Sequence, residues 1–177
     1  MGRLRSFLGR LRRDEEGVAS FDFILIFPVY FMFLLASVEA GILMTRQVLL
    51  DRGVDMAVRQ VRINTLNPPT YVQMRKMICE AAALIPDCEN TLKLEMFIQD
   101  PRGTFNFKRN PDCIDRSLQN QPASIYTLGS QNQIMFVRAC VKYDPVFPTS
   151  IVATAVIDGG GEYALVSTNI YVAEPNG

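Results

Sequence analysis

The chain has 177 residues, and its 18 Lys and Arg residues balance its 18 Asp and Glu residues, so the formal net charge is zero. This balance provides no basic surface of the kind that nucleic-acid binding requires. The chain also has no histidine, which excludes Ser-His-Asp and Cys-His catalysis and histidine-ligated metals.

The N-terminal region combines a basic start with a long apolar stretch. The first 13 residues contain five arginines and no acid, and residues 23–38 carry no charge. Apolar character resumes after Glu39 and ends at Met44, so the stretch is 22 residues long, enough for a helix to cross a bilayer. Pro28 lies one turn inside it and removes one helical hydrogen bond. The five arginines outnumber the three that follow, which predicts a cytoplasmic N-terminus.

Composition leaves three interpretations of this region open. The region could act as a signal anchor or as a secretory signal peptide cleaved after Ala40. In the third interpretation it contains a prepilin-type leader, which is cleaved after a glycine while the apolar helix is retained. A plain signal peptide predicts nothing about the residues beyond Ala40, so the pattern that follows is informative.

The helical pattern continues beyond the apolar stretch. Four apolar residues occupy one face at 4-3-4 spacing, with charged residues on the other faces: Leu50, Val54, Ala57 and Val61. The sequence Asn67-Pro68-Pro69 ends the pattern. We therefore expect one continuous helix over about residues 22–63, roughly 60 Å long, which favours a retained helix.

The residues around Gly17 resemble a prepilin-peptidase site, in which cleavage follows a glycine and an acid stands at the fifth mature position. With Val18 as the first mature residue, Asp22 is the fifth. Together with Pro28 and Glu39, this arrangement resembles the TadE-like family of pilin-like proteins from tight-adherence (Flp) pilus systems. That family usually has glutamate where this chain has Asp22. The resemblance implies a leader over residues 1–17 and a transmembrane helix with an amphipathic half over residues 18–64.

Each of the two carboxylates that flank or interrupt the apolar stretch has two interpretations. A carboxylate at the edge of an apolar span is costly unless it is paired, and Asp22 can pair with the α-amine that cleavage frees on Val18. Alternatively, Ser20 or Asp22 caps the helix. For Glu39, a specific contact competes with a side chain that extends to the outer membrane interface.

The remaining residues, 65–177, predict a small α+β domain with one helix and an antiparallel sheet. Thr70 is expected to cap a helix over residues 71–85, which Pro86 ends. Alternating apolar residues predict strands, with turns and loops between them: strands at residues 92–99, 134–143 and about 163–172, a turn at 100–103 with a return strand starting at Phe105, a polar loop over 110–132, and a further loop containing Pro145 and Pro148. The strand, proline-rich loop and strand that end at residues 172–175 also resemble the C-terminal part of TadE-like proteins.

The four cysteines all follow the apolar stretch and include no C-x-x-C pair. An even number suits an oxidising periplasm and predicts two disulfides, whereas four reduced cysteines would indicate a cytoplasmic domain. Three pairings are possible. We favour Cys79 with Cys88, because a helix end and the loop after Pro86 are close. This leaves Cys113 with Cys140, which would pin a loop on the more polar face of a strand.

No phosphate-binding, hydrolase or metal-binding motif is present, and we expect neither enzyme activity nor a cofactor. The resemblance implies a minor pilin-like (pseudopilin) subunit for Flp pilus assembly, single-pass in the bacterial inner membrane with a periplasmic C-terminal domain. Its implied partners are other pilin-like subunits, pilus platform proteins, the prepilin peptidase and the lipid bilayer. The alternatives are a periplasmic binding or enzymatic domain, tethered by a signal anchor or released after Ala40, and a pseudopilin of general secretion.

Overall fold

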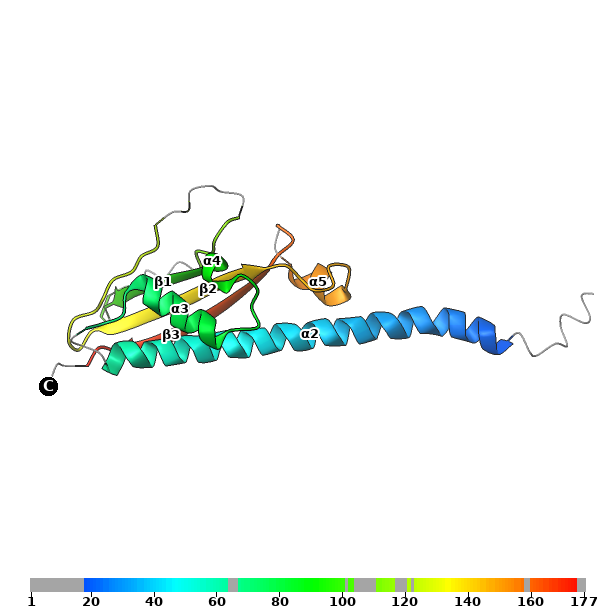
Figure 1. The fold of residues 1–177 in the computed structure, drawn as a ribbon, viewed down its shortest axis with the longest axis horizontal. Coiled ribbons are helices and arrows are strands. Elements are labelled where there is room, and N and C mark those ends of the chain that lie inside the picture. Colours follow the sequence, from blue (N-terminus) through cyan, green and yellow to red (C-terminus); the bar gives the residue numbers. More distant parts are fainter. Residues whose placement is uncertain are drawn as a thin grey trace, which may run out of the picture.

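The structure, a computed structural model, describes residues 18–63, 67–100, 102–103, 111–116, 121, 123–157 and 160–174. Their elements are, in chain order, α2 (Val18–Ile63), α3 (Tyr71–Ala81), α4 (Cys88–Thr91), β1 (Leu92–Gln99), β2 (Ile134–Tyr143), α5 (Ile151–Val156) and β3 (Tyr163–Val172). A long helix thus precedes a small domain with an antiparallel sheet of order β1-β2-β3 (Figure 1). The predicted α+β class is confirmed.

Helix α2 is continuous for 46 residues and contains Pro28. Its second half packs against the domain, and its first half extends beyond it (Figure 1). The predicted apolar face is the one that packs, because its four residues are at most 7% exposed. The expected continuous helix is therefore present, and its amphipathic half is the part that the domain covers.

The core lies between the inner face of the sheet and the helices α2 and α3. Fully buried apolar side chains come from every layer, and each stabilises the fold by about 1.5–3 kcal/mol relative to exposure: Leu50, Val54, Met74, Ile78, Leu92, Leu94, Met96, Met135, Val137 and Val141. Gly53 allows α2 and α3 to approach closely, since a Cβ atom there would lie 2.8 Å from the carbonyl oxygen of Ile78.

Helix α3 begins as expected and ends early. Thr70 forms a capping box with Gln73, which satisfies backbone donors at the helix start. The helix ends at Ala81, four residues before the predicted end, because the next residues form a turn in which the Ile85 amide donates to the Ala82 carbonyl at 2.9 Å. This turn brings the chain back toward α4.

The described partner of β1 is a strand distant in the sequence, and the predicted hairpin stays a prediction. Its antiparallel partner is β2, with Leu92 opposite Val141, and the expected return strand at Phe105 lies outside the described residues. The other edge of β1 is also partly paired: the Met96 amide donates to the Ile125 carbonyl at 2.8 Å, and the Thr127 amide donates to the Met96 carbonyl at 2.9 Å. The predicted loop over 110–132 thus includes an edge contact, because the backbone groups of a buried edge need partners.

The two shortest helices, α4 and α5, were not predicted. They contain four and six residues, too few for an apolar period to show in the sequence. Helix α5 lies within the expected proline loop and is capped by Ser150, whose hydroxyl accepts from the Ala153 amide at 3.0 Å.

Candidate functional site

The first half of α2 exposes an almost continuous apolar surface. Phe23, Ile24 and Phe33 are each more than 60% exposed. The rings of Phe23, Phe27 and Phe31 stack along one side, with centroids 5.0 and 5.8 Å apart. Among the described residues, α2 is the one helix that is long and apolar enough to cross a membrane. Such an exposed surface is stable only when lipid or other proteins cover it.

Asp22 lies near the start of this apolar surface, and its side chain is exposed. The helix begins at Val18, so Ser20 and Asp22 lie within its first two turns and not at its N-cap. The capping interpretation is therefore wrong. Gly17 and the rest of the predicted leader lie outside the described residues.

Glu39 has a specific contact, and the expectation that it extends to the outer membrane interface is wrong. The residue is only 1% exposed. Its carboxylate accepts hydrogen bonds from the backbone N–H groups of Val146, at 3.1 Å, and Phe147, at 2.9 Å. The chain after β2 returns over α2 and presents two donors that need a partner, and the carboxylate supplies it with charge-assisted hydrogen bonds.

Two tyrosines lie near Glu39, and Arg46 lies against the ring of one of them. The Arg46 guanidinium lies 4.5 Å from the centroid of the Tyr143 ring, and its Nε donates to the Leu84 carbonyl at 2.9 Å. Tyr143 and Tyr163 are each 1% exposed, with their rings in edge contact. We refer to Glu39, Arg46, Tyr143 and Tyr163 as the Glu39 cluster. It joins α2 to β2, β3 and the turn after α3 at the point where α2 leaves the domain.

Burial keeps both phenols of the cluster neutral. Burial raises the pKa of Tyr163 to about 12, and the charge of Glu39 acts in the same direction. Burial also raises the pKa of Tyr143, although nearby Arg46 opposes this shift. Neither tyrosine therefore carries a charge at neutral pH. The apolar surroundings of Glu39 in the sequence indicated that it needs a partner, but no pattern identified Arg46 or the two tyrosines.

The two disulfides are the pairs that the sequence favours. Cys79 joins Cys88 with a Cα–Cα distance of 5.6 Å, and Cys113 joins Cys140 with a distance of 5.2 Å. The first links the last turn of α3 to the start of α4. The second holds residues 111–116 on the outer face of the sheet, which is the more polar strand face, as expected.

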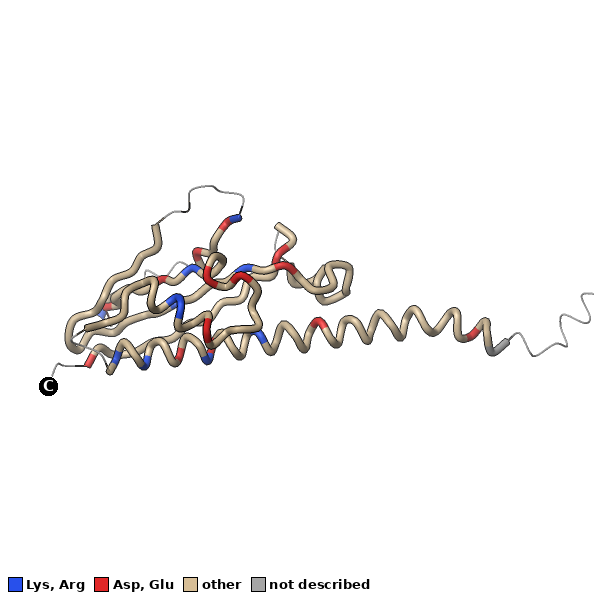
Figure 2. Tube along the Cα trace, in the orientation of Figure 1, with Lys and Arg blue, Asp and Glu red and all other residues tan. Residues whose placement is uncertain are grey.

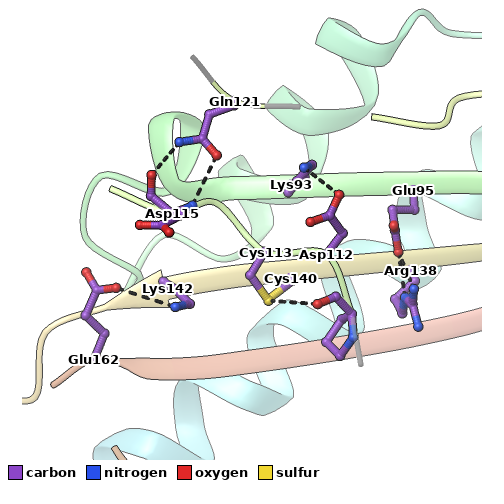
Figure 3. Close-up of a disulfide and its surroundings, with 11 residues drawn as sticks. Lys93, Glu95, Asp112, Cys113, Asp115, Gln121, Arg138, Cys140, Lys142 and Glu162 are labelled. Carbon is purple, nitrogen blue, oxygen red and sulfur yellow. Dashed lines mark hydrogen bonds and ion pairs between the residues drawn. A yellow bond between two sulfur atoms is a disulfide. The ribbon is translucent and has the colours of Figure 1, made fainter. Parts of the chain in front are cut away.

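This outer face contains buried charges, each with a partner (Figure 3). Lys93 is 2% exposed, and its Nζ lies 2.7 Å from a carboxylate oxygen of Asp112. Arg138 is 4% exposed and donates from Nε to Glu95 at 2.7 Å. Because a buried charge without a partner is strongly destabilising, the Cys113–Cys140 bond has a clear role: it holds Asp112 over Lys93.

Removing the second disulfide is expected to destabilise the domain more than removing the first. The Cys113–Cys140 bond closes a segment with a sequence separation of 27, against 9 for Cys79–Cys88. Its loss is expected to cost about 2–4 kcal/mol, since the longer closed loop restricts the unfolded chain more. Urea unfolding of the two Cys→Ser double variants, followed by circular dichroism, measures the difference. An equal or reversed order would contradict the prediction.

The described residues also include a groove at the far end of the domain. Its volume is about 480 Å³, and it is lined by residues that include Val61, Leu128 and Tyr171, next to the Arg62–Glu174 ion pair. A groove of this size can hold a small molecule. Within the described part of the chain, no group of three or more Cys, Asp or Glu residues is placed to hold a metal ion.

Comparison with known proteins finds one similarity, over about a quarter of the chain. Residues 17–59 match the family model described as TadE-like protein, so the predicted resemblance to that family is confirmed over this segment. The match includes Asp22, Pro28, Glu39 and Arg46, and it begins at Gly17. Residues 172–175 lie outside it. No curated protein and no solved structure matches the chain.

Proposed function

We propose that this chain is a minor pilin-like (pseudopilin) subunit that serves the assembly of a tight-adherence (Flp) pilus. The observation that carries the proposal is the match of residues 17–59 to the TadE-like family, a family of pilus-assembly components. The form of this segment supports it: one helix whose apolar half is exposed and whose other half is packed into a domain.

In this function the apolar half of α2 is the association element. It lies in the bilayer and contacts other pilin-like subunits and the platform proteins through its exposed apolar side chains. Asp22 is the one charged residue in the first 21 residues of the described chain. Because a carboxylate in apolar surroundings requires a partner, Asp22 pairs with the α-amine that prepilin peptidase frees on Val18, in the same subunit or a neighbouring one.

The charges and the disulfides support a location in the inner membrane. The basic leader stays in the cytoplasm, α2 crosses the inner membrane once, and the domain lies in the periplasm, where disulfides form and persist. The Glu39 cluster joins the domain firmly to α2, so the orientation of the helix determines the orientation of the domain.

Substitution of Asp22 tests this proposal. Asp22→Ala is expected to leave membrane insertion intact, since it removes a charge from the apolar edge. It is expected to lower incorporation into the assembly at least tenfold, because loss of one member of a desolvated ion pair costs on the order of 3 kcal/mol. The measurement is recovery of other pilin-like subunits with the tagged chain from crosslinked membranes.

Two controls accompany this experiment. Asp22→Glu is expected to retain incorporation, because it keeps the carboxylate that the family usually carries. Asp51→Ala removes an exposed acid from the packed half of the same helix and is expected to have no effect. Equal recovery from Asp22→Ala and the unaltered chain would contradict the proposed role.

A further inference from the structure

The chain between β2 and β3 contains a long uncharged stretch. Residues 145–157, which we refer to as the α5 segment, carry no charge and lie between Asp144 and Asp158. Three of its apolar side chains are about half exposed, Val146 at 45%, Ile151 at 49% and Val156 at 53%. Other apolar side chains of the domain are equally exposed, so the position of these three, on one uncharged segment, decides what they contact.

The position of the α5 segment indicates what that contact is. The segment lies beyond the end of the sheet, above the middle of α2 (Figure 1). It is held there by the hydrogen bonds from Val146 and Phe147 to Glu39. The segment carries no charged residue between Asp144 and Asp158, and Figure 2 shows the loop around α5 in tan beside the middle of α2. The exposed apolar surface of the α5 segment is thus adjacent to the apolar half of α2.

Helix geometry gives the depth of this position. Glu39 follows Phe23, the first residue of the apolar stretch, by about 24 Å at 1.5 Å per residue. The hydrocarbon core of a bilayer is about 30 Å thick. If Phe23 marks the inner boundary, Glu39 lies within the outer edge of the core, and Arg46, at about 34 Å, lies just outside it. The α5 segment then lies at the level of the outer leaflet.

The Glu39 contact makes such a position energetically acceptable. A charged side chain and unpaired backbone N–H groups are each costly in contact with hydrocarbon. Here the carboxylate satisfies the two N–H groups, and the residue is 1% exposed. What remains on the surface of the segment is uncharged: apolar side chains, together with Thr149 and with Thr154, whose hydroxyl donates to backbone carbonyls within the segment. Amphipathic elements of this kind bury their apolar side chains at the boundary between headgroups and acyl chains.

We propose that the α5 segment inserts into the outer, periplasmic leaflet beside α2, with Val146, Ile151 and Val156 in contact with the acyl-chain boundary. The inference rests on the proposed function only in requiring that α2 spans the membrane. The domain would then have a second membrane contact, which limits how far α2 can tilt in the bilayer.

Tryptophan fluorescence tests this insertion directly, because the chain has no tryptophan. Ile151→Trp places a single probe at a half-exposed site in the full chain, reconstituted at low protein density in phosphatidylcholine vesicles that contain brominated lipid. Its emission is expected to shift to shorter wavelength and to be quenched at least twofold by the bromines. Val156→Trp provides a second probe of the same segment, should the first variant fold poorly.

Two matched variants separate this inference from the proposed function. Ile125 is 59% exposed and lies beside β1, away from the α5 segment. A tryptophan introduced by Ile125→Trp is therefore expected to remain unquenched. Phe31→Trp lies in the apolar half of α2 and reports whether the helix spans the bilayer. If Phe31→Trp is quenched and both α5 probes are not, the insertion is wrong while the membrane anchor stands. If neither region is quenched, both proposals are wrong. If the emission of an α5 probe shifts to shorter wavelength without quenching, the segment is covered by protein, such as a second copy of the chain. That result would also contradict insertion into the bilayer.

Discussion

Gly17→Leu is expected to leave the full-length precursor in the membrane, with no chain that begins at Val18. A prepilin-type peptidase must accept a residue with almost no side chain before the bond that it cleaves, and Gly17 is the one glycine in residues 10–22. The intact mass of the membrane-extracted chain distinguishes an N-terminus at Val18, Gly41 or Met1. The same measurement, made with and without reduction and alkylation, gives the number of disulfides.

The matched control for this experiment is Ala40→Leu, which is expected to be processed normally. Cleavage after Ala40 would interrupt α2, which is continuous through this residue. It would also remove Glu39 and leave the amides of Val146 and Phe147 without the carboxylate that they contact. If Gly17→Leu is processed and Ala40→Leu accumulates as precursor, the chain is an ordinary secreted protein and the pilin-like function is wrong.

Glu39→Ala is expected to lower the free energy of unfolding by roughly 3 kcal/mol. The substitution removes two charge-assisted hydrogen bonds and leaves two backbone donors unsatisfied, at a cost of about 1–3 kcal/mol for each group. Urea unfolding in detergent measures the total. Hydrogen exchange measures the local effect: the amides of Val146 and Phe147 are expected to exchange about two orders of magnitude faster, since each 1.4 kcal/mol corresponds to a factor of ten.

Two variants make the Glu39 experiment specific. Glu39→Gln keeps the size of the side chain but offers one acceptor oxygen in place of two. We therefore expect it to lower the free energy of unfolding by about half as much as Glu39→Ala does. Asp51→Ala removes an exposed acid from the same helix, and surface substitutions of this kind usually change stability by less than about 0.5 kcal/mol. If Glu39→Ala behaves like Asp51→Ala, the Glu39 cluster does not hold the α5 segment on α2.

The elements that sequence reasoning identified correctly are those with strong local signals. The long helix follows from an uncharged stretch and from the 3.6-residue periodicity of Leu50, Val54, Ala57 and Val61, and α3 follows from the cap at Thr70. The three strands follow from alternation of apolar and polar residues over eight to ten positions. The prediction of both disulfides depended on the short sequence separation between Cys79 and Cys88. Once these two are paired, only one pairing remains for the other two cysteines.

The tertiary structure alone decided which polar residues are buried and what they contact. Glu39 looks in the sequence like a charge that interrupts a membrane span, because its donors lie more than 100 residues away at Val146 and Phe147. Lys93 and Glu95 look like the solvent face of a strand, yet they are buried when residues 111–116 and β2 bring Asp112 and Arg138 to them. Periodicity reports only the alternation of faces along one element. Whether a face meets water or another part of the chain depends on contacts between distant segments, which form only when the whole domain packs.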